Sequence, residues 1–289
     1  MEIWSTILLT IKVLINISMS FGKESDALPV CDSNTQSSKI TCDINNNNTS
    51  TDILIKILNK LKNGRTFDNL HIRCQENSKI FWNSSAFVDT FKSLKVEECF
   101  CETDQTVIQI NATNLQSLEF FKVNTEFFKY VEIDSSIHLS SLSINRCGLP
   151  AIPEFVLKMD RSNLQKLFLK TNQITHINCE LFKGVPCLDK KCYLNLFGNQ
   201  IVDIPDCVCK PSIIWYNINF YNNRISNVSN LQCLDQIHVD AQDNSIEELP
   251  NFTFIGTITI DFTFNKIKRI RRETFSKSKL CSTISLSYN

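Results

Sequence analysis

Cysteine is the residue type with the richest chemistry in this chain, which has 13 cysteines among 289 residues. Two pairs are separated by one residue, Cys99-x-Cys101 and Cys207-x-Cys209. Zinc sites favour C-x-x-C pairs with a second pair or histidines at a matching distance, and the sequence offers neither. We therefore expect no metal and no cofactor. A cysteine density this high favours disulfides in an oxidising compartment, and the odd number leaves one thiol without a partner in this chain.

The four histidines, His71, His138, His176 and His238, do not point to an active site. An enzyme needs polar groups that converge on one reacting atom. His71 and His238 map to strands roughly thirty ångströms apart if each layer is about 4.8 Å thick. Glycine-rich phosphate loops and a nucleophile elbow are missing from the sequence, which has only 6 glycines. We expect no enzymatic activity and a solvated surface position for each histidine.

The charge balance argues against a polyanionic partner for the chain as a whole. Lys+Arg and Asp+Glu both count 30, so the formal net charge is zero. No net field therefore attracts nucleic acid or an anionic membrane. The 43% hydrophobic content is enough for a substantial core.

The start of the chain predicts export. Ile7 to Ile17 is mostly apolar, and the small residues Ser18, Ser20 and Gly22 follow it, so we expect a signal peptide over residues 1–22. A buried N-terminal strand and an uncleaved anchor remain alternatives, although the stretch is short and interrupted for a membrane span. Six N-x-Ser/Thr sequons follow, which are candidate glycosylation sites. They are Asn47, Asn48, Asn83, Asn111, Asn227 and Asn251.

A repeating frame must position all of these residues. In LQKLFLKTNQI, Leu164 to Ile174, apolar residues lie 8, 5 and 3 places before Asn172 and one lies 2 places after it. The frame recurs every 21 to 27 residues, and ten matches in register predict a solenoid of stacked repeats. The residues at the asparagine position of the successive repeats are Gln75, Cys99, Val123, Cys147, Asn172, Asn199, Asn223, Asn244, Asn265 and Asn289.

The frame resembles the leucine-rich repeat, L-x-x-L-x-L-x-x-N/C-x-L, over residues 67–289. The resemblance implies an α/β solenoid shaped like a horseshoe, with parallel strands on the concave face, loops and short helical turns on the convex face, and a disulfide-bearing N-terminal cap. Asparagine can satisfy backbone groups where the chain turns off each strand, and cysteine can fill the same position as a small buried residue. Val123 cannot form such bonds, so we expect its repeat to be locally irregular.

The segment before the repeats resembles the cysteine-bearing cap of secreted leucine-rich repeat proteins. VCDSNTQSSKITCD contains Cys31 and Cys42, whereas such caps usually have four cysteines, and the resemblance implies a Cys31–Cys42 disulfide that closes a small hairpin. Residues 52–62 have apolar side chains at helical spacing and predict either an amphipathic helix or an irregular first repeat. We assign residues 23–66 to the cap and first segment.

The remaining cysteines allow several pairings. Ten places after the asparagine position, an apolar column on the convex side brings Cys209 and Cys233 into neighbouring layers, either as a disulfide or as two small hydrophobic residues. Cys99 and Cys147, at the asparagine position, are the expected free thiols. Two further candidate pairs are Cys187 with Cys192 and Cys179 with Cys207.

The outward strand residues lie 6, 4 and 2 places before the asparagine position and predict a binding surface. Aromatic residues fall there in three successive layers, between lysines on one side and aspartates on the other. Clustered exposed aromatics mark interaction surfaces, although aromatics can also simply cover one another on a sheet. The candidate ligand-binding residues are Lys166, Phe168, Lys170, Tyr193, Phe197, Asn219, Tyr221 and Asp240.

The resemblance implies extracellular recognition of a protein or glycan ligand, as in the outer part of a Toll-like receptor or a secreted adhesion protein. A matrix protein that self-associates and a reduced intracellular inhibitor of the same fold are the rival interpretations. The ending ISLSYN places Asn289 at the asparagine position without a convex half, so we interpret the last repeat as incomplete and the chain as a fragment. We expect a location outside the cell or on the outer side of the plasma membrane, with membrane association possible through a missing C-terminal region.

Overall fold

The computed structural model describes residues 29–45, 49–62, 66–75, 78–82, 91–104, 107–110, 112–185, 191–209, 215–231, 237–254, 258–278 and 283–289. Several predictions from the sequence fall outside these residues: the signal peptide over 1–22, the sequons at Asn47, Asn48, Asn83 and Asn111, and the cysteines Cys187 and Cys233. The side chain of Cys209 is also outside the described part, so a Cys209–Cys233 disulfide stays a prediction.

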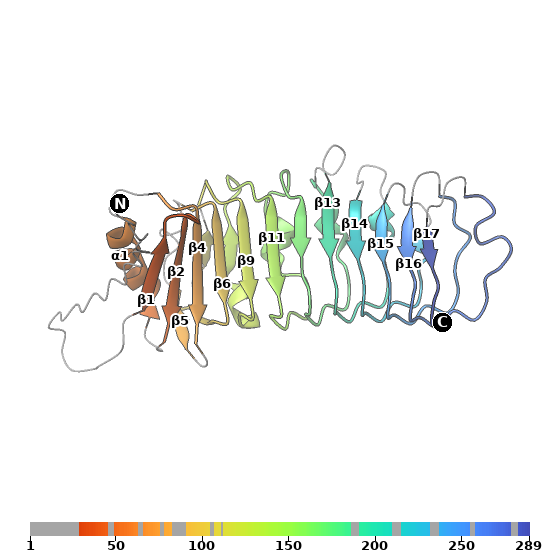
Figure 1. Ribbon diagram of the computed structural model, residues 1–289, viewed down its shortest axis with the longest axis horizontal. Coiled ribbons are helices and arrows are strands. Elements are labelled where there is room, and N and C mark those ends of the chain that lie inside the picture. The colour runs from red at the N-terminus through yellow and green to blue at the C-terminus, as the bar shows by residue number, and fades with distance from the viewer. Residues whose placement is uncertain are drawn as a thin grey trace, which may run out of the picture.

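One long sheet runs the length of the described chain (Figure 1). Its first two strands pair antiparallel, and each later strand pairs parallel with the one before it. In order, the strands are β1 Val30–Asn34, β2 Lys39–Ile44, β4 Asn69–Cys74, β6 Ser93–Glu97, β9 Ser117–Phe121, β11 Ser141–Asn145, β12 Lys166–Phe168, β13 Cys192–Asn195, β14 Trp215–Asn219, β15 His238–Asp240, β16 Thr259–Asp261 and β17 Thr283–Ser285.

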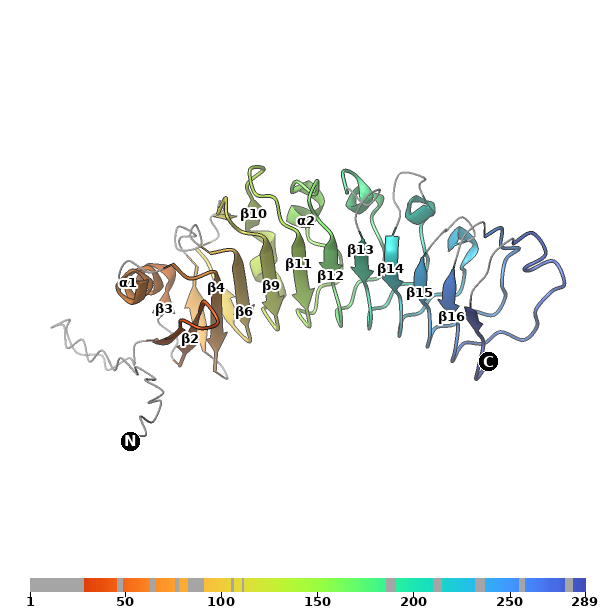
Figure 2. The same ribbon diagram turned by 45° about the horizontal axis from the view of Figure 1, so that its top comes forward.

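Short elements form the opposite layer, and the row of strands bends away from them, so that the strands line the inner side of the arch (Figure 2). Two small parallel sheets lie in this layer, β3-β5-β7 and β8-β10. Their strands are β3 Thr49–Ser50, β5 Lys79–Phe81, β7 Phe100–Glu102, β8 Ile108–Ile110 and β10 Val131–Ile133. The helices are α1 Thr51–Lys62 and α2 Glu154–Lys158, with 3-10 turns η2 Thr125–Lys129, η3 Cys179–Phe182, η4 Asp206–Cys209 and η5 Ser229–Leu231. This is the predicted leucine-rich repeat architecture.

Strand periodicity places the core where the sequence predicts it. Side chains alternate along a strand, so residues five and three places before the asparagine position share the inner face. Leu94 and Val96 in β6, and Leu194 and Leu196 at β13, are all 0% exposed. The buried side chains of successive layers therefore stack into one continuous core behind the sheet.

The N-terminal cap is joined to the sheet covalently and by hydrogen bonds. Cys31 and Cys42 face each other across the β1–β2 hairpin and form the expected disulfide. β2 then pairs with β4 in parallel over six residues, so the cap continues directly into the repeats. Residues 51–62 form a helix, α1, which buries Leu54 and Leu58; this settles the choice between a helix and an irregular repeat.

Two further disulfides with both cysteines in the described residues join neighbouring layers. Cys179–Cys207 is present, as one of the candidate pairs proposed, and Cys192 is also disulfide-bonded, whereas Cys187 lies outside the described residues. The expectation of a free Cys99 was wrong, because Cys74 at the end of β4 lies 4.9 Å from it between Cα atoms and the two are bonded. Cys147 is a free buried thiol as expected, and Cys101 is a second.

Asparagine side chains bridge the turns of the C-terminal layers. In Asn223, Oδ1 accepts a hydrogen bond from the N–H of Ile201 at 3.0 Å, and Nδ2 donates to the carbonyls of Leu196 and Phe220 at 3.0 and 2.9 Å. Asn199, Asn244, Asn265 and Asn289 make the same set of contacts to their own and the preceding layer. Each Oδ1 thus satisfies a backbone N–H of the preceding layer, and successive Nδ2 groups share the carbonyls between them.

The Val123 repeat is regular, contrary to the prediction. β9 pairs with both neighbouring strands over five residues, and Lys122 takes the same left-handed turn, φ 52°, as the equivalent residues of other repeats. The next residue supplies the missing amide. Asn124 Oδ1 accepts from the N–H of Cys101 at 2.7 Å and its Nδ2 donates to the Cys101 carbonyl at 3.0 Å. In this repeat, therefore, the amide that bonds the backbone of the preceding layer belongs to the residue after the asparagine position.

Candidate binding face

The eight candidate residues gather on the concave side of β12 to β15. The parallel register aligns Lys166 with Tyr193 and aligns Asn219 with Asp240. Lys166 is exposed and the other seven are half-buried, so the predicted group forms one surface across four layers. We call this surface the aromatic–amide band; its residues are the eight candidates together with Asn195, Tyr216 and Asn217.

Aromatic side chains in the band touch one another and also remain open to solvent. Phe197 and Tyr221 are stacked with their centroids 5.1 Å apart, and Tyr193 meets Tyr216 edge-on at 5.4 Å. The Nζ of Lys170 lies 5.3 Å from the Phe168 ring centroid. The sequence left open whether the aromatic side chains bind a ligand or simply cover one another. The rings of these pairs do cover one another in part, and they remain accessible to solvent.

Tyr216 is a member of the band that sequence reasoning missed. The pairing of β13 with β14 shifts register between Cys192 and Tyr193, so Cys192 pairs with Trp215 and Tyr193 with Asn217. Such a bulge leaves one residue unpaired and re-aims it. Tyr216 is consequently 44% exposed, with the Nζ of Lys191 4.5 Å from its ring centroid. The repeat frame assigns no outward residue seven places before the asparagine position, so only the aromatic-rich string WYNIN hinted at an exposed Tyr216.

A row of Asn and Asp residues runs through the band four places before the asparagine position. Each uses Oδ1 to accept the backbone N–H two residues later, at 3.1 Å for Asn195, 3.0 Å for Asn219, 3.2 Å for Asp240 and 2.9 Å for Asp261. These Asx turns divert that N–H from the sheet. The strands β13, β14, β15 and β16 accordingly end at this Asn or Asp, whereas β6, β9 and β11 continue for two residues beyond the equivalent position.

Asp240 supplies the carboxyl of the band. Burial raises its pKa above the ordinary value of 3.8, and the neighbouring Asp261 carboxyl acts in the same direction. The N–H of Gln242, the charge of His238 and the amide of Asn219 oppose the shift, with Asn219 Nδ2 donating to Asp240 Oδ2 at 3.1 Å. A carboxyl held this way is a hydrogen-bond acceptor placed at the centre of a polar row.

The concave face of the N-terminal layers is built differently. His71 Nε2 lies 2.6 Å from Glu97 Oε2, and Lys95 bridges Glu97 and Glu119 at 3.3 and 3.4 Å. The His71 side chain is only 12% exposed, so the expectation of a solvated histidine was wrong there. Burial is the largest cause of its lowered pKa, and it outweighs the hydrogen bond to Glu97. Ion pairs thus occupy this part of the face.

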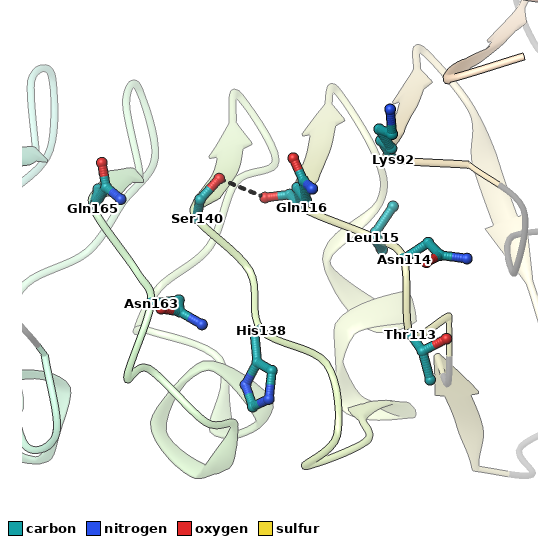
Figure 3. Close-up of a pocket in the computed structure, with 9 residues that line it drawn as sticks. All are labelled: Lys92, Thr113, Asn114, Leu115, Gln116, His138, Ser140, Asn163 and Gln165. Carbon is teal, nitrogen blue, oxygen red and sulfur yellow. Dashed lines mark hydrogen bonds between the residues drawn. The ribbon is translucent and has the colours of Figure 1, made fainter.

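A separate polar hollow lies at the edge where the chain enters the strands (Figure 3). It measures about 350 Å³ and contains none of the eight candidates. Its polar lining comes from residues seven and nine places before the asparagine position, with Ser140 Oγ donating to the Gln116 carbonyl at 3.0 Å. The lining residues are Lys92, Thr113, Asn114, Leu115, Gln116, His138, Ser140, Asn163 and Gln165.

Other predicted groups lie apart from the band. Asn227 and Asn251 are exposed, as acceptor asparagines must be. His138 Nδ1 lies 2.8 Å from Asp160 Oδ2 on the surface. Cys179, Asp206 and Cys207 have metal-like spacing, but the two sulfurs are bonded to each other and offer no thiolate.

The parallel sheet, the asparagine bridges and the inward periodicity together define a leucine-rich repeat solenoid with a disulfide-bearing N-terminal cap. Comparison with family models and with curated proteins finds no match. Among solved structures, the chain is similar to a leucine-rich repeat protein of Leptospira interrogans, with a TM-score of 0.41 and 18% identity over 76% of this chain and 60% of that one. The chain therefore spans less than two thirds of that neighbour's length. Within the described part, no helix is both long and apolar enough to cross a bilayer.

Proposed function

We propose that this protein is an extracellular recognition module, without catalytic activity, whose aromatic–amide band binds a protein or glycan ligand. The observation that carries the proposal is the stacked Phe197–Tyr221 pair beside the Asn195–Asn219–Asp240 row, on a half-open concave surface. Rigid aromatic rings provide contact area at low entropic cost, and adjacent amides and carboxyls provide directional hydrogen bonds.

The band has donors and acceptors left for a partner. The Asn195 and Asn219 Oδ1 atoms accept one backbone N–H each, and Asp240 receives two hydrogen bonds that fix its rotamer. A surface whose side chains are already ordered loses little conformational entropy on binding. Its strands are rigid elements of a sheet, which suits precise recognition better than a loop does.

Disulfides support the extracellular setting. Cys31–Cys42, Cys74–Cys99 and Cys179–Cys207 hold three separate parts of the solenoid. Disulfides of this number persist in secreted and cell-surface proteins and are rare in the reducing cytosol. A reduced intracellular inhibitor is the less favoured interpretation for that reason, and mass-spectrometric counting of free thiols in secreted protein tests it.

The test replaces Phe168, Phe197 and Tyr221 together by Ser. We expect secretion to continue and binding to an array of extracellular protein domains and glycans to be lost. The matched control is Phe81→Ser with Phe100→Ser, which removes two aromatics 37% and 48% exposed on the convex strands β5 and β7. Array binding by the triple variant equal to that of the wild type would refute the proposal.

A self-associating matrix protein is the rival function. Analytical ultracentrifugation of the full chain at high dilution separates the two. A monomer that binds the array fits the recognition module, whereas persistent oligomers that lose no binding in the triple variant favour the matrix protein.

A further inference from the structure

One segment carries a charge that the neutral whole chain does not predict. KIKRIRR, Lys266 to Arg272, has five cations in seven residues. It follows Asn265 and leaves the concave face at the C-terminal end of the solenoid (Figure 2). All five charged side chains belong to exposed residues, so the segment is a concentrated basic surface on a chain with no net charge.

The exposure of this basic segment follows from its place in the repeat. The residues three and four places after the asparagine position are exposed in the preceding layers as well, at Ser226 and Asn227 and at Glu247 and Glu248. Lys268 and Arg269 are the equivalent residues of the next layer. Their exposure is therefore a regular property of these positions.

Neighbouring carboxylates neutralise only part of the basic segment. Lys268 pairs with Glu247 at 3.2 Å and Arg271 pairs with Glu248 at 2.6 Å. Lys266 Nζ donates to the Ser245 hydroxyl at 3.2 Å, which leaves its charge uncompensated. Arg269 and Arg272 have no ion pair within the part of the chain that the structure describes. Two guanidinium groups thus remain available, and a guanidinium forms paired hydrogen bonds with planar or tetrahedral oxyanions.

An exposed aromatic ring precedes the basic segment in the sequence by one turn residue. Phe264 is 53% exposed and takes a left-handed φ of 56°, the conformation that Lys122, Arg146 and Asp243 also take in the same turn of earlier layers. Its ring stacks on Tyr288 with centroids 4.7 Å apart, which presents flat apolar surface in the same layer as the start of the basic segment.

From these observations we infer that the basic segment Lys266–Arg272 binds a sulfated polysaccharide. Sulfate groups match the free guanidiniums, and sugar rings match the exposed aromatic surface. Five exposed cations spread along seven consecutive residues, which suits a linear polyanion better than a single ion. This choice of polyanion rests on the proposed extracellular setting, which the disulfides support and where sulfated polysaccharides, not nucleic acids, are the polyanions at hand. This site is separate from the aromatic–amide band.

The experiment measures binding of the full chain to heparin at about 0.15 M ionic strength, where screening limits nonspecific attraction. Arg269→Ala with Arg272→Ala is expected to weaken binding roughly tenfold or more and to flatten its salt dependence. The matched control is Lys56→Ala with Lys60→Ala, which removes the same charge from exposed positions on α1. That control should bind heparin as the wild type does. Desulfated heparin, duplex DNA and vesicles containing phosphatidylserine serve as comparison probes.

Each result of this experiment either supports the inference or overturns it. Binding that needs sulfation and both arginines, with much weaker binding of DNA and vesicles, supports it. Absence of heparin binding in the wild type overturns it, as does an equal loss in the two double variants. A preference for DNA or for the vesicles also overturns it, since the segment would then recognise a different polyanion. Failure of the concave-face test leaves this result unaffected, because that test changes neither arginine.

Discussion

Different residues stabilise the turn after each strand in the two halves of the concave sheet. The N-terminal layers have Cys or Val at the asparagine position and five-residue strands, and their faces carry ion pairs such as Lys95–Glu119. The C-terminal layers have Asn at that position, an Asx row, and strands that end two residues earlier in the repeat. Where side chains take over the last backbone hydrogen bonds of a strand, backbone pairing ends early.

The difference shows how a repeat protein can separate stability from recognition. In the C-terminal half the amides of the asparagine position point inward and secure the turn, which leaves the outward residues free to be aromatic and polar. In the N-terminal half the buried Cys74–Cys99 disulfide does part of that work, and ion pairs such as His71–Glu97 occupy the outward face. Four predictions test this difference between the halves, in order of decreasing expected effect.

The largest effect is expected for Asn223→Ala. Its side chain serves the Ile201 N–H and the Leu196 and Phe220 carbonyls, all in buried surroundings. Losing three hydrogen bonds and leaving the buried Ile201 N–H without its partner should lower the free energy of unfolding by about 4 kcal/mol, measured by urea denaturation. The two carbonyls keep their hydrogen bonds from Asn199 and Asn244. Cys147→Ala is the matched change in the N-terminal half and should cost only about 1 kcal/mol, because its Sγ makes weak contacts at 3.2 and 3.9 Å. Equal losses would erase the contrast.

Removing the Cys74–Cys99 disulfide should come next. Its sequence separation of 25 residues predicts a loss of about 3 kcal/mol for Cys74→Ala with Cys99→Ala. Amide hydrogen exchange should rise in β4 and β6 and stay unchanged in β15 and β16, since repeats couple mainly to their neighbours. A uniform rise along the solenoid would show that the halves are not separable.

Asn124→Ala tests whether the displaced asparagine replaces the missing one at Val123. It should cost about 2 kcal/mol, since two hydrogen bonds to the Cys101 backbone are lost. Asn163→Ala, at a half-buried residue of the edge hollow, serves as the control and should change the urea midpoint little. If the two variants unfold at the same midpoint, Asn124 has no bridging role.

The smallest expected effect is the change of local stability with pH, which has opposite signs in the two halves of the sheet. The lowered pKa of His71 gives stability that is present above 6.5 and is lost as pH falls through its folded value. The raised pKa of Asp240 gives stability that is present below 3.8 and is lost as pH rises through its folded value. Acidification should therefore loosen β4 and β6 while tightening β15, as read by hydrogen exchange corrected for intrinsic rates. His71→Gln and Asp240→Asn should each flatten the response of their own half only.

Several local features followed from the sequence alone. The repeat period fixed which residues point inward, because alternation along a strand needs no knowledge of the neighbours. It therefore predicted the core and the clustering of Phe197, Asn219 and Tyr221 on one face. The hairpin disulfide of Cys31 with Cys42 was implied by the resemblance of the first segment to a cysteine-bearing cap. The basic run at Lys266–Arg272 was equally visible, but a net charge of zero obscured it.

Only the tertiary structure decided the contacts between neighbouring layers, whose residues lie some 25 positions apart in the sequence. The pairing of Cys74 with Cys99, the transfer of the asparagine role to Asn124 and the burial of His71 against Glu97 all depend on which atoms the stacked neighbour presents. The bulge that exposes Tyr216 depends on register between two strands. The sequence by itself determines the repeating unit, because that is local; how one unit completes the next is decided by stacking, because the partner atoms come from a different turn of the solenoid.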